Sequence, residues 1–232
     1  MLLYLMFMVP GLLLALFAQW KVSSTYKKYA RVGNAQGLTG LDVARILMRN
    51  EGLSHVTVER IAGELTDHYD PRSKVMRLSD GSSQMPSVAA MAIVAHELGH
   101  AKQDSEGYAW LKLRSGIVGI ANVGSNFGWV LIFIGMILGA AQGSRFGFSL
   151  ALVGVVLMSA AVAFSLVTLP VEFNASSRAR DMLVRNGLVT AQEAQGVNSV
   201  LNAAALTYVA AAAQAVLQLF YWIAVLSGTR RN

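Results

Sequence analysis

The chain has 232 residues, of which 54% are hydrophobic, and a mean hydropathy of +0.47, which excludes an ordinary soluble domain. The net charge is +6, but no nucleic-acid-binding motif accompanies it and the basic residues do not form one stripe. We therefore expect contact with anionic membrane lipid and no nucleic acid. The absence of cysteine excludes thiol nucleophiles, disulfides and cysteine-ligated zinc.

Four stretches without a charged residue predict membrane spans, because each holds at least 20 residues. They are 1–20, 115–144, 146–171 and 194–229. We expect about four transmembrane helices, at Leu2–Trp20, Gly116–Gln142, Phe148–Leu169 and Ala203–Leu226. The first is interpreted as an uncleaved anchor, because it lacks a charged n-region and its basic flank follows it.

The distribution of charge predicts the orientation. Residues 21–115 and 170–202 hold 16 of the 19 Lys and Arg residues and all 13 acidic residues. Four spans place these two segments on one side of the membrane, and both termini and the 143–147 turn on the other. The positive-inside rule makes the shared side cytoplasmic. We expect a mainly α, multi-pass integral protein of the plasma membrane, forming one membrane-embedded unit over 1–232.

The hydrophilic segment 21–115 has the pattern of a small α+β region. TGLDVARILMRNEG at 39–52 predicts an amphipathic helix that Thr39 or Asp42 caps. The stretches LTDHY and KVMRLS flank the turn signal Asp70-Pro71 and predict a β-hairpin. Pro86-Ser87 then opens another helix.

That helix carries VAHELGHAKQD at 94–104. His96 and His100 are four residues apart, so both side chains lie on one helix face and can bind one metal ion. Glu97 sits beside them, where it can reach a metal-bound water, as in HExxH zinc proteases. Zinc lowers the pKa of that water to about 7, and Glu97 can take its proton and pass it to the leaving amine. Gly99 weakens the helix by about 1 kcal/mol relative to alanine, which indicates that something packs close to it.

A hydrolytic zinc normally has a third protein ligand and an open position. Without cysteine, the candidates are His55, His68 and the carboxylate of Glu172, which directly follows the third span. Two spans separate His100 from Glu172, so the chain returns to the same face of the membrane, and we favour Glu172. The alternative is a glutamate at a helix start after Pro170, favoured there by the helix dipole.

The chain resembles the YugP-type neutral zinc metallopeptidases of bacterial membranes. The resemblance rests on TGLDVAR at 39–45, LTDHYDPRSKVMRLS at 65–79, AHELGHAKQ at 95–103 and LPVEFNASSRA at 169–179. It implies a zincin-like membrane protease with His96, His100 and Glu172 on Zn2+ and Glu97 as catalytic acid and base. The chain is similar, more distantly, to HtpX-type and CAAX-processing gluzincins.

Those gluzincins have an aspartate four residues after the third ligand, where this chain has Ser176. Ser176, Asp104 and Asp181 are therefore candidates to orient a ligand histidine. His68 lies in the motif of the resemblance, and it either donates to the oxyanion during catalysis or bonds the backbone of the turn. His55 is expected to be structural or exposed.

The sequence predicts a zinc-dependent membrane endopeptidase at the cytoplasmic membrane surface, with membrane-associated proteins or peptides as substrates and membrane-protein quality control as a candidate role. The alternative is a non-catalytic zinc-binding membrane scaffold or adaptor, against which the intact Glu97 argues. An intramembrane zinc is disfavoured, because the apolar run before His96 has only nine residues and charged residues follow it.

Two further expectations concern binding. We expect the strand KVMRLS to present an open backbone edge to which an extended substrate adds. The GxxxG pairs at 124/128 and 135/139 suit close helix packing, either within the chain or between copies in a homo-oligomer or with a membrane-protein partner.

Overall fold

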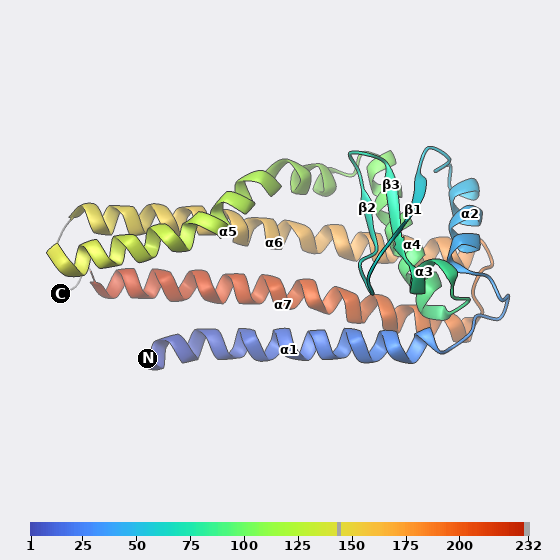
Figure 1. Ribbon diagram of the computed structural model, residues 1–232, viewed down its shortest axis with the longest axis horizontal. Helices are drawn as coiled ribbons and strands as arrows, with labels where there is room; N and C mark the ends of the chain where they lie inside the picture. Colours follow the sequence, from blue (N-terminus) through green and yellow to red (C-terminus); the bar gives the residue numbers. More distant parts are fainter. Residues whose placement is uncertain (143–144, 230–232) are drawn as a thin grey trace. The chain divides into compact units, whose positions relative to one another are not determined.

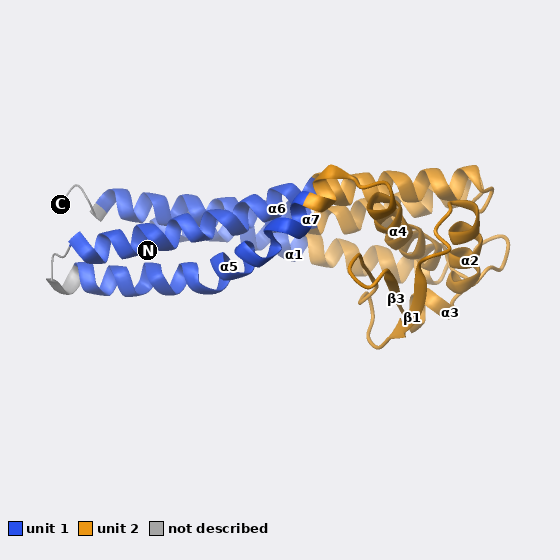
Figure 2. Ribbon diagram, turned by 90° about the horizontal axis from the view of Figure 1, so that it is seen from above, with its two compact units in different colours: residues 1–17, 113–169, 208–232 blue, residues 18–112, 170–207 orange. Residues whose placement is uncertain are grey.

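The structure is a computed structural model that describes residues 1–142 and 145–229. The described residues divide into two compact units: those within 1–17, 113–169 and 208–232 make up unit 1, and 18–112 and 170–207 make up unit 2 (Figure 2). The predicted turn at 143–147 lies partly outside the described residues. That the whole chain works as one membrane-embedded unit stays a prediction.

Long helices dominate the described chain (Figure 1). Four of them are long and apolar enough to cross a membrane: α1 (Leu2–Ala30), α5 (Ala109–Gln142), α6 (Arg145–Arg185) and α7 (Ala191–Thr229). Each contains one of the four predicted spans and continues beyond it. The mainly helical class and the four candidate spans are thus confirmed.

The alternative in which Glu172 lies at a helix start after Pro170 is wrong. α6 runs without a break from Arg145 to Arg185, and Pro170 lies inside it. Proline lacks the N–H of one helical hydrogen bond, a loss that membrane helices tolerate where other groups satisfy the freed carbonyl. Glu172 therefore lies in a helix interior, and the dipole of a helix N-terminus cannot explain its presence.

In unit 1, the glycines of α5 lie against the backbone of α6. A Cβ on Gly135 would lie 2.5 Å from the Gly147 carbonyl oxygen, and one on Gly128 would lie 3.0 Å from the Gly154 carbonyl oxygen. Gly124 faces the Leu157 carbonyl oxygen even more closely. These GxxxG residues thus serve close packing within the chain, as small residues do in membrane helices.

Unit 2 contains a three-stranded sheet made of β1 (Thr57–Ile61), β2 (His68–Asp70) and β3 (Val75–Ser79). The strands lie in the order β1-β3-β2, so β3 is central. β3 pairs antiparallel with β2, which confirms the predicted hairpin, and parallel with β1. Both edges of β3 are therefore occupied. The expectation that KVMRLS offers an open edge to substrate is wrong, because β1, which precedes the hairpin in the chain, pairs with the other side of β3.

Unit 2 also contains three shorter helices, α2 (Gly40–Asn50), α3 (Asp80–Gln84) and α4 (Val88–Ser105), together with the parts of α1, α6 and α7 that lie within 18–112 and 170–207. Thr39 and Asp42 cap α2 together in a capping box, and Ser87 caps α4. α4 buries most of its length, since Val88–Met91, Val94, Leu98 and Ala101 all pack into the core. The zinc-motif helix is thus held on several sides at once.

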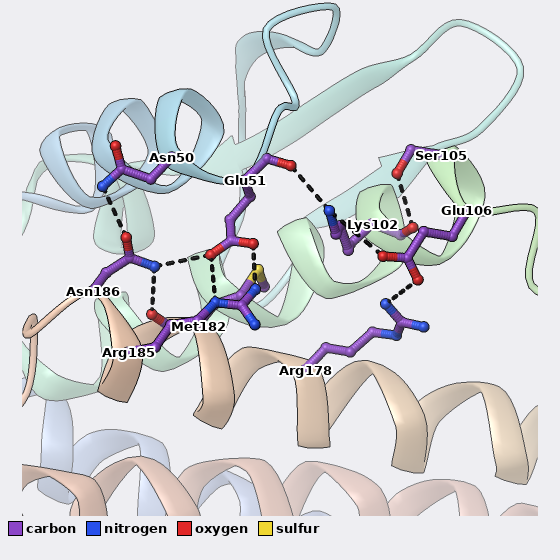
Figure 3. Close-up of polar contacts among 9 residues, drawn as sticks. All are labelled: Asn50, Glu51, Lys102, Ser105, Glu106, Arg178, Met182, Arg185 and Asn186. Atoms are coloured by element: carbon purple, nitrogen blue, oxygen red, sulfur yellow. Dashed lines mark hydrogen bonds and ion pairs between the residues drawn. The ribbon is translucent and has the colours of Figure 1, made fainter.

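A polar cluster joins the end of α2 to α4 and to the end of α6 (Figure 3). The Glu51 side chain is only 6% exposed, and its carboxylate accepts hydrogen bonds from Arg185 and from Asn186 Nδ2, the latter at 2.9 Å. The Glu51 backbone carbonyl accepts from Lys102 Nζ at 3.1 Å. Burial by itself raises the pKa of Glu51, but the hydrogen bonds from Arg185 and Asn186 outweigh it and leave the pKa below its usual value.

We predict that Glu51→Gln destabilises the folded protein by about 0.5–1.5 kcal/mol at neutral pH, because charge-assisted hydrogen bonds are lost from a partly exposed site. The lowered pKa means that this stabilisation is present above the unfolded-state pKa of about 4.3 and is lost as the pH falls through the folded-state value. Denaturation in detergent at neutral and at acidic pH measures the difference between wild type and variant. A difference that stays constant with pH would contradict this role.

Candidate metal centre

The metal centre depends on a close approach between α4 and α6. A Cβ on Gly99 would lie 2.5 Å from the carbonyl oxygen of Ala175, so the two helix backbones touch there. No other residue type fits at position 99 without moving one helix. The expectation that a close neighbour explains Gly99 is confirmed, and the contact lies between the two histidines of the motif.

At this contact the carboxylate of Glu172 lies between His96 and His100. Its Oε2 atom is 3.2 Å from His96 Nε2 and 3.5 Å from His100 Nε2. The potential ligand atoms of the three residues all lie within 4.8 Å of one another. Glu172 is 1% exposed and His100 is 9% exposed. His55 and His68 do not belong to this group.

These distances fit zinc. Two ligand atoms that each lie 2.0–2.1 Å from zinc at a tetrahedral angle are about 3.3 Å apart. The two observed nitrogen–oxygen separations lie on either side of that value. A carboxylate buried this deeply needs a charged or hydrogen-bonding partner, and a divalent cation would supply one.

The electrostatics of the group favour a cation. Burial lowers the pKa of His100, but the hydrogen bond and the negative charge of Glu172 outweigh it and raise that pKa above its usual value. The same negative charge that attracts a proton here attracts a metal ion.

Each histidine of this group has a partner on its second ring nitrogen. Ser176, one of the candidates for an orienting role, has its Oγ 3.3 Å from His96 Nδ1. Gln103 Oε1 lies 3.0 Å from His100 Nδ1, a contact the sequence reasoning missed. The sequence did offer one indication of this contact: Gln103 follows His100 by three residues, so both side chains lie on the same helix face.

The two acidic candidates for that orienting role lie elsewhere. Asp104 accepts hydrogen bonds from the Tyr69 hydroxyl at 2.7 Å and from Lys74 Nζ at 2.5 Å, and so fastens the hairpin to α4. Burial and this contact with Asp104 raise the pKa of Tyr69. Asp181 lies on the wall of a surface cavity of about 290 Å³. Neither is hydrogen-bonded to a ligand histidine.

The candidate acid and base, Glu97, follows the first ligand on α4 and is 8% exposed. His68 is exposed on β2, where its Nδ1 bonds the Thr66 carbonyl oxygen at 2.9 Å and its Nε2 lies 3.5 Å from Arg77 Nη1. These contacts match the alternative in which His68 bonds the turn, and its part in catalysis stays a prediction. His55 is exposed, as expected.

Comparison with known proteins gives the family. Residues 4–227 match the family described as "Putative neutral zinc metallopeptidase". The chain belongs to this family. It is also 42% identical over 231 residues to a protein of Bacillus subtilis (strain 168) named "Putative membrane protease YugP", across 99% of this chain and 100% of that one. No solved structure matches. The predicted resemblance is confirmed, and Zn2+ is the cofactor of a neutral zinc metallopeptidase.

We predict that Gly99→Ala weakens zinc binding at least about tenfold, because the added methyl group separates α4 from α6 and withdraws Glu172 from the histidines. The matched control is Gly116→Ala, a helical glycine whose Cβ would meet nothing within 4 Å. Competition with a chromogenic chelator measures both affinities in detergent. Wild-type affinity in Gly99→Ala would show that the helix contact is not needed.

Proposed function

We propose that this neutral zinc metallopeptidase is a gluzincin-type endopeptidase that cuts membrane-associated proteins or peptides at the cytoplasmic membrane surface. The observation that carries the proposal is the convergence of His96 Nε2 and His100 Nε2 on one oxygen of Glu172, with Glu97 next to the first histidine. Three protein ligands leave one position of a tetrahedral zinc for water or substrate, which is the arrangement of a catalytic site.

In this mechanism His96, His100 and Glu172 would hold the metal. Zinc bound there would lower the pKa of its water to about 7 and polarise the scissile carbonyl. The Glu97 carboxylate takes the proton of the attacking water and then gives it to the amine that leaves. None of the hydrogen bonds within residues 1–142 and 145–229 involves the Glu97 carboxylate, so that group has lone pairs available for water.

His68 remains a weaker candidate for stabilising the oxyanion. Arg77 can only donate, so the neutral His68 ring accepts on Nε2 and donates from Nδ1 to Thr66. Both nitrogens are then engaged within the hairpin. His68 would have to turn away from Arg77 before it could donate to a substrate.

The position of Glu172 supports substrates close to the bilayer. Glu172 follows the apolar segment 148–169 in the same helix, α6. Loops and tails of membrane proteins are the peptide segments available at that level, which suits a role in membrane-protein quality control. The basic residues that follow the first span would meet anionic lipid on the cytoplasmic side.

A zinc-binding scaffold without catalysis is the second candidate. It would use the same three ligands but would need no Glu97. A carboxylate that is nearly buried beside a metal ligand and bonds to none of the described residues adds nothing to a structural site, which favours the peptidase.

We predict that Glu97→Gln keeps zinc and loses about 10²–10⁴-fold or more in peptide hydrolysis, because the general base is gone. Zinc content and the cleavage of membrane-protein substrates are measured on the same preparation. Glu64→Gln, at an exposed position outside the site, is the matched control and should retain activity. Near-normal hydrolysis by zinc-loaded Glu97→Gln would rule out the proposed role.

The orientation can be tested with single cysteines, since the chain has none of its own. Ser54→Cys reports on the segment 21–115, and Arg145→Cys reports on the turn between the second and third spans; both positions are exposed. In intact cells a membrane-impermeant maleimide should label Arg145→Cys and should label Ser54→Cys only after lysis. The opposite pattern would place the metal centre outside the cell.

A further inference from the structure

Gln103 is a fully buried amide at the contact between α4 and α6. A buried carboxamide is costly unless its donors and acceptor are paired. Its Oε1 atom faces His100 Nδ1 at 3.0 Å. Its Nε2 atom faces the Val171 carbonyl oxygen at 2.8 Å and Asn174 Oδ1 at 2.9 Å. One side chain thus joins a metal-ligand candidate on α4 to two positions on α6.

The direction of each hydrogen bond follows from the chemistry of the partners. The Val171 carbonyl oxygen can only accept, so the amide NH2 of Gln103 must face it. Arg178 Nε can only donate, and it lies 2.7 Å from Asn174 Oδ1, so that oxygen of Asn174 faces both Arg178 and Gln103. Gln103 Oε1 is then left for His100, and His100 must donate to it from Nδ1.

This direction sets the tautomer of His100. A neutral imidazole with hydrogen on Nδ1 has its lone pair on Nε2. Nε2 is the atom that lies 3.5 Å from the Glu172 carboxylate, where a metal would bind. A metal-binding histidine is oriented in this way by the partner of its other nitrogen.

The series of hydrogen bonds from His100 through Gln103 and Asn174 ends at Arg178, which is held in place at the protein surface. Arg178 Nη1 donates to Glu106 Oε2 at 2.6 Å, and Lys102 Nζ lies 3.5 Å from the same carboxylate (Figure 3). Arg178 also lies over the ring of Tyr108, 5.9 Å from its centroid. Asn174 and Arg178 both line the surface cavity of about 290 Å³. Arg178 therefore keeps a fixed position from which to donate to Asn174.

We propose that Gln103 and Asn174 are positioning residues of the zinc site, through which Arg178 fixes His100 in the tautomer and ring orientation that bind metal. The proposal rests on the ligand set of the proposed function. The neutral Gln103 amide takes the place that a carboxylate occupies beside many zinc-binding histidines. Glu172 then contributes the one formal negative charge of the three-ligand group.

The test measures zinc affinity of the full chain in detergent by chelator competition, together with the visible spectrum of the Co2+ form. Gln103→Leu should weaken zinc binding about 10–100-fold and alter the Co2+ spectrum, because the acceptor for His100 is lost. Asn174→Leu should weaken binding in the same direction. Asn174→Asp keeps an oxygen for both Gln103 and Arg178, and its affinity and spectrum should stay close to those of the wild type.

Glu51→Gln is the control for a structural effect, because it removes a partly buried polar contact elsewhere in unit 2 and should lower stability without changing zinc affinity. The proposal is overturned if Gln103→Leu binds zinc as tightly as Glu51→Gln. It is also overturned if Asn174→Asp loses as much affinity as Asn174→Leu.

The ligand set itself is checked separately with His96→Ala and Glu172→Gln. Normal zinc binding by these two variants would refute the proposed ligands before the role of Gln103 is assessed. Loss of zinc by both, with wild-type affinity in Gln103→Leu, would refute the positioning role alone. Because the readout is metal binding, the result does not depend on finding a cleavable substrate.

Discussion

The metal centre depends on the contact between the Gly99 position of α4 and the carbonyl oxygen of Ala175 on α6. Protein interiors are close-packed, so one added methyl group at such a contact shifts a whole helix. The imidazoles at positions 96 and 100 extend from one helix toward a carboxylate on the other, and their reach is limited. The proximity of the two backbones therefore decides whether three ligand atoms meet at one point or remain separate buried polar groups.

The sequence of α6 is suited to this approach. Glu172, Ala175, Ser176 and Ala179 recur at the spacing of one helix face, and all four are buried. The two alanines allow the backbones to approach, while the glutamate and the serine meet the histidines. The cost of burying polar atoms is limited because each of them has a partner on α4.

Much of this arrangement could be predicted from the sequence, because local patterns carry it. The capping of α2 by Thr39 and Asp42 and the pairing of β2 with β3 depend on neighbouring residues. The histidines of α4 lie within five consecutive positions, and Glu172 could be chosen because a carboxylate beside an apolar span needs a partner.

Three features could not be predicted from the sequence because they depend on long-range packing: the continuity of α6 through Pro170, the central place of β3 and the role of Gln103. Proline at 170 indicated a helix start, but the tertiary environment of α6 overrides that local preference. From its sequence KVMRLS is expected to leave one backbone edge open, and only the parallel pairing of the earlier strand β1 shows that it is central. Gln103 carries no motif of its own. Its importance becomes visible only once Val171 and Asn174, about 70 residues later in the chain, are known to lie beside it.

The continuity of α6 has a consequence for biosynthesis. Glu172 lies 76 residues after His96, so it is synthesised only after all of α5 and the apolar part of α6. A nascent chain that carries only the histidine motif lacks the third ligand, and closing so long a loop is entropically unfavourable until its helices have formed. The group of three side chains can therefore assemble only in a chain that already contains the apolar part of α6, and a chain that ends before Glu172 would lack it.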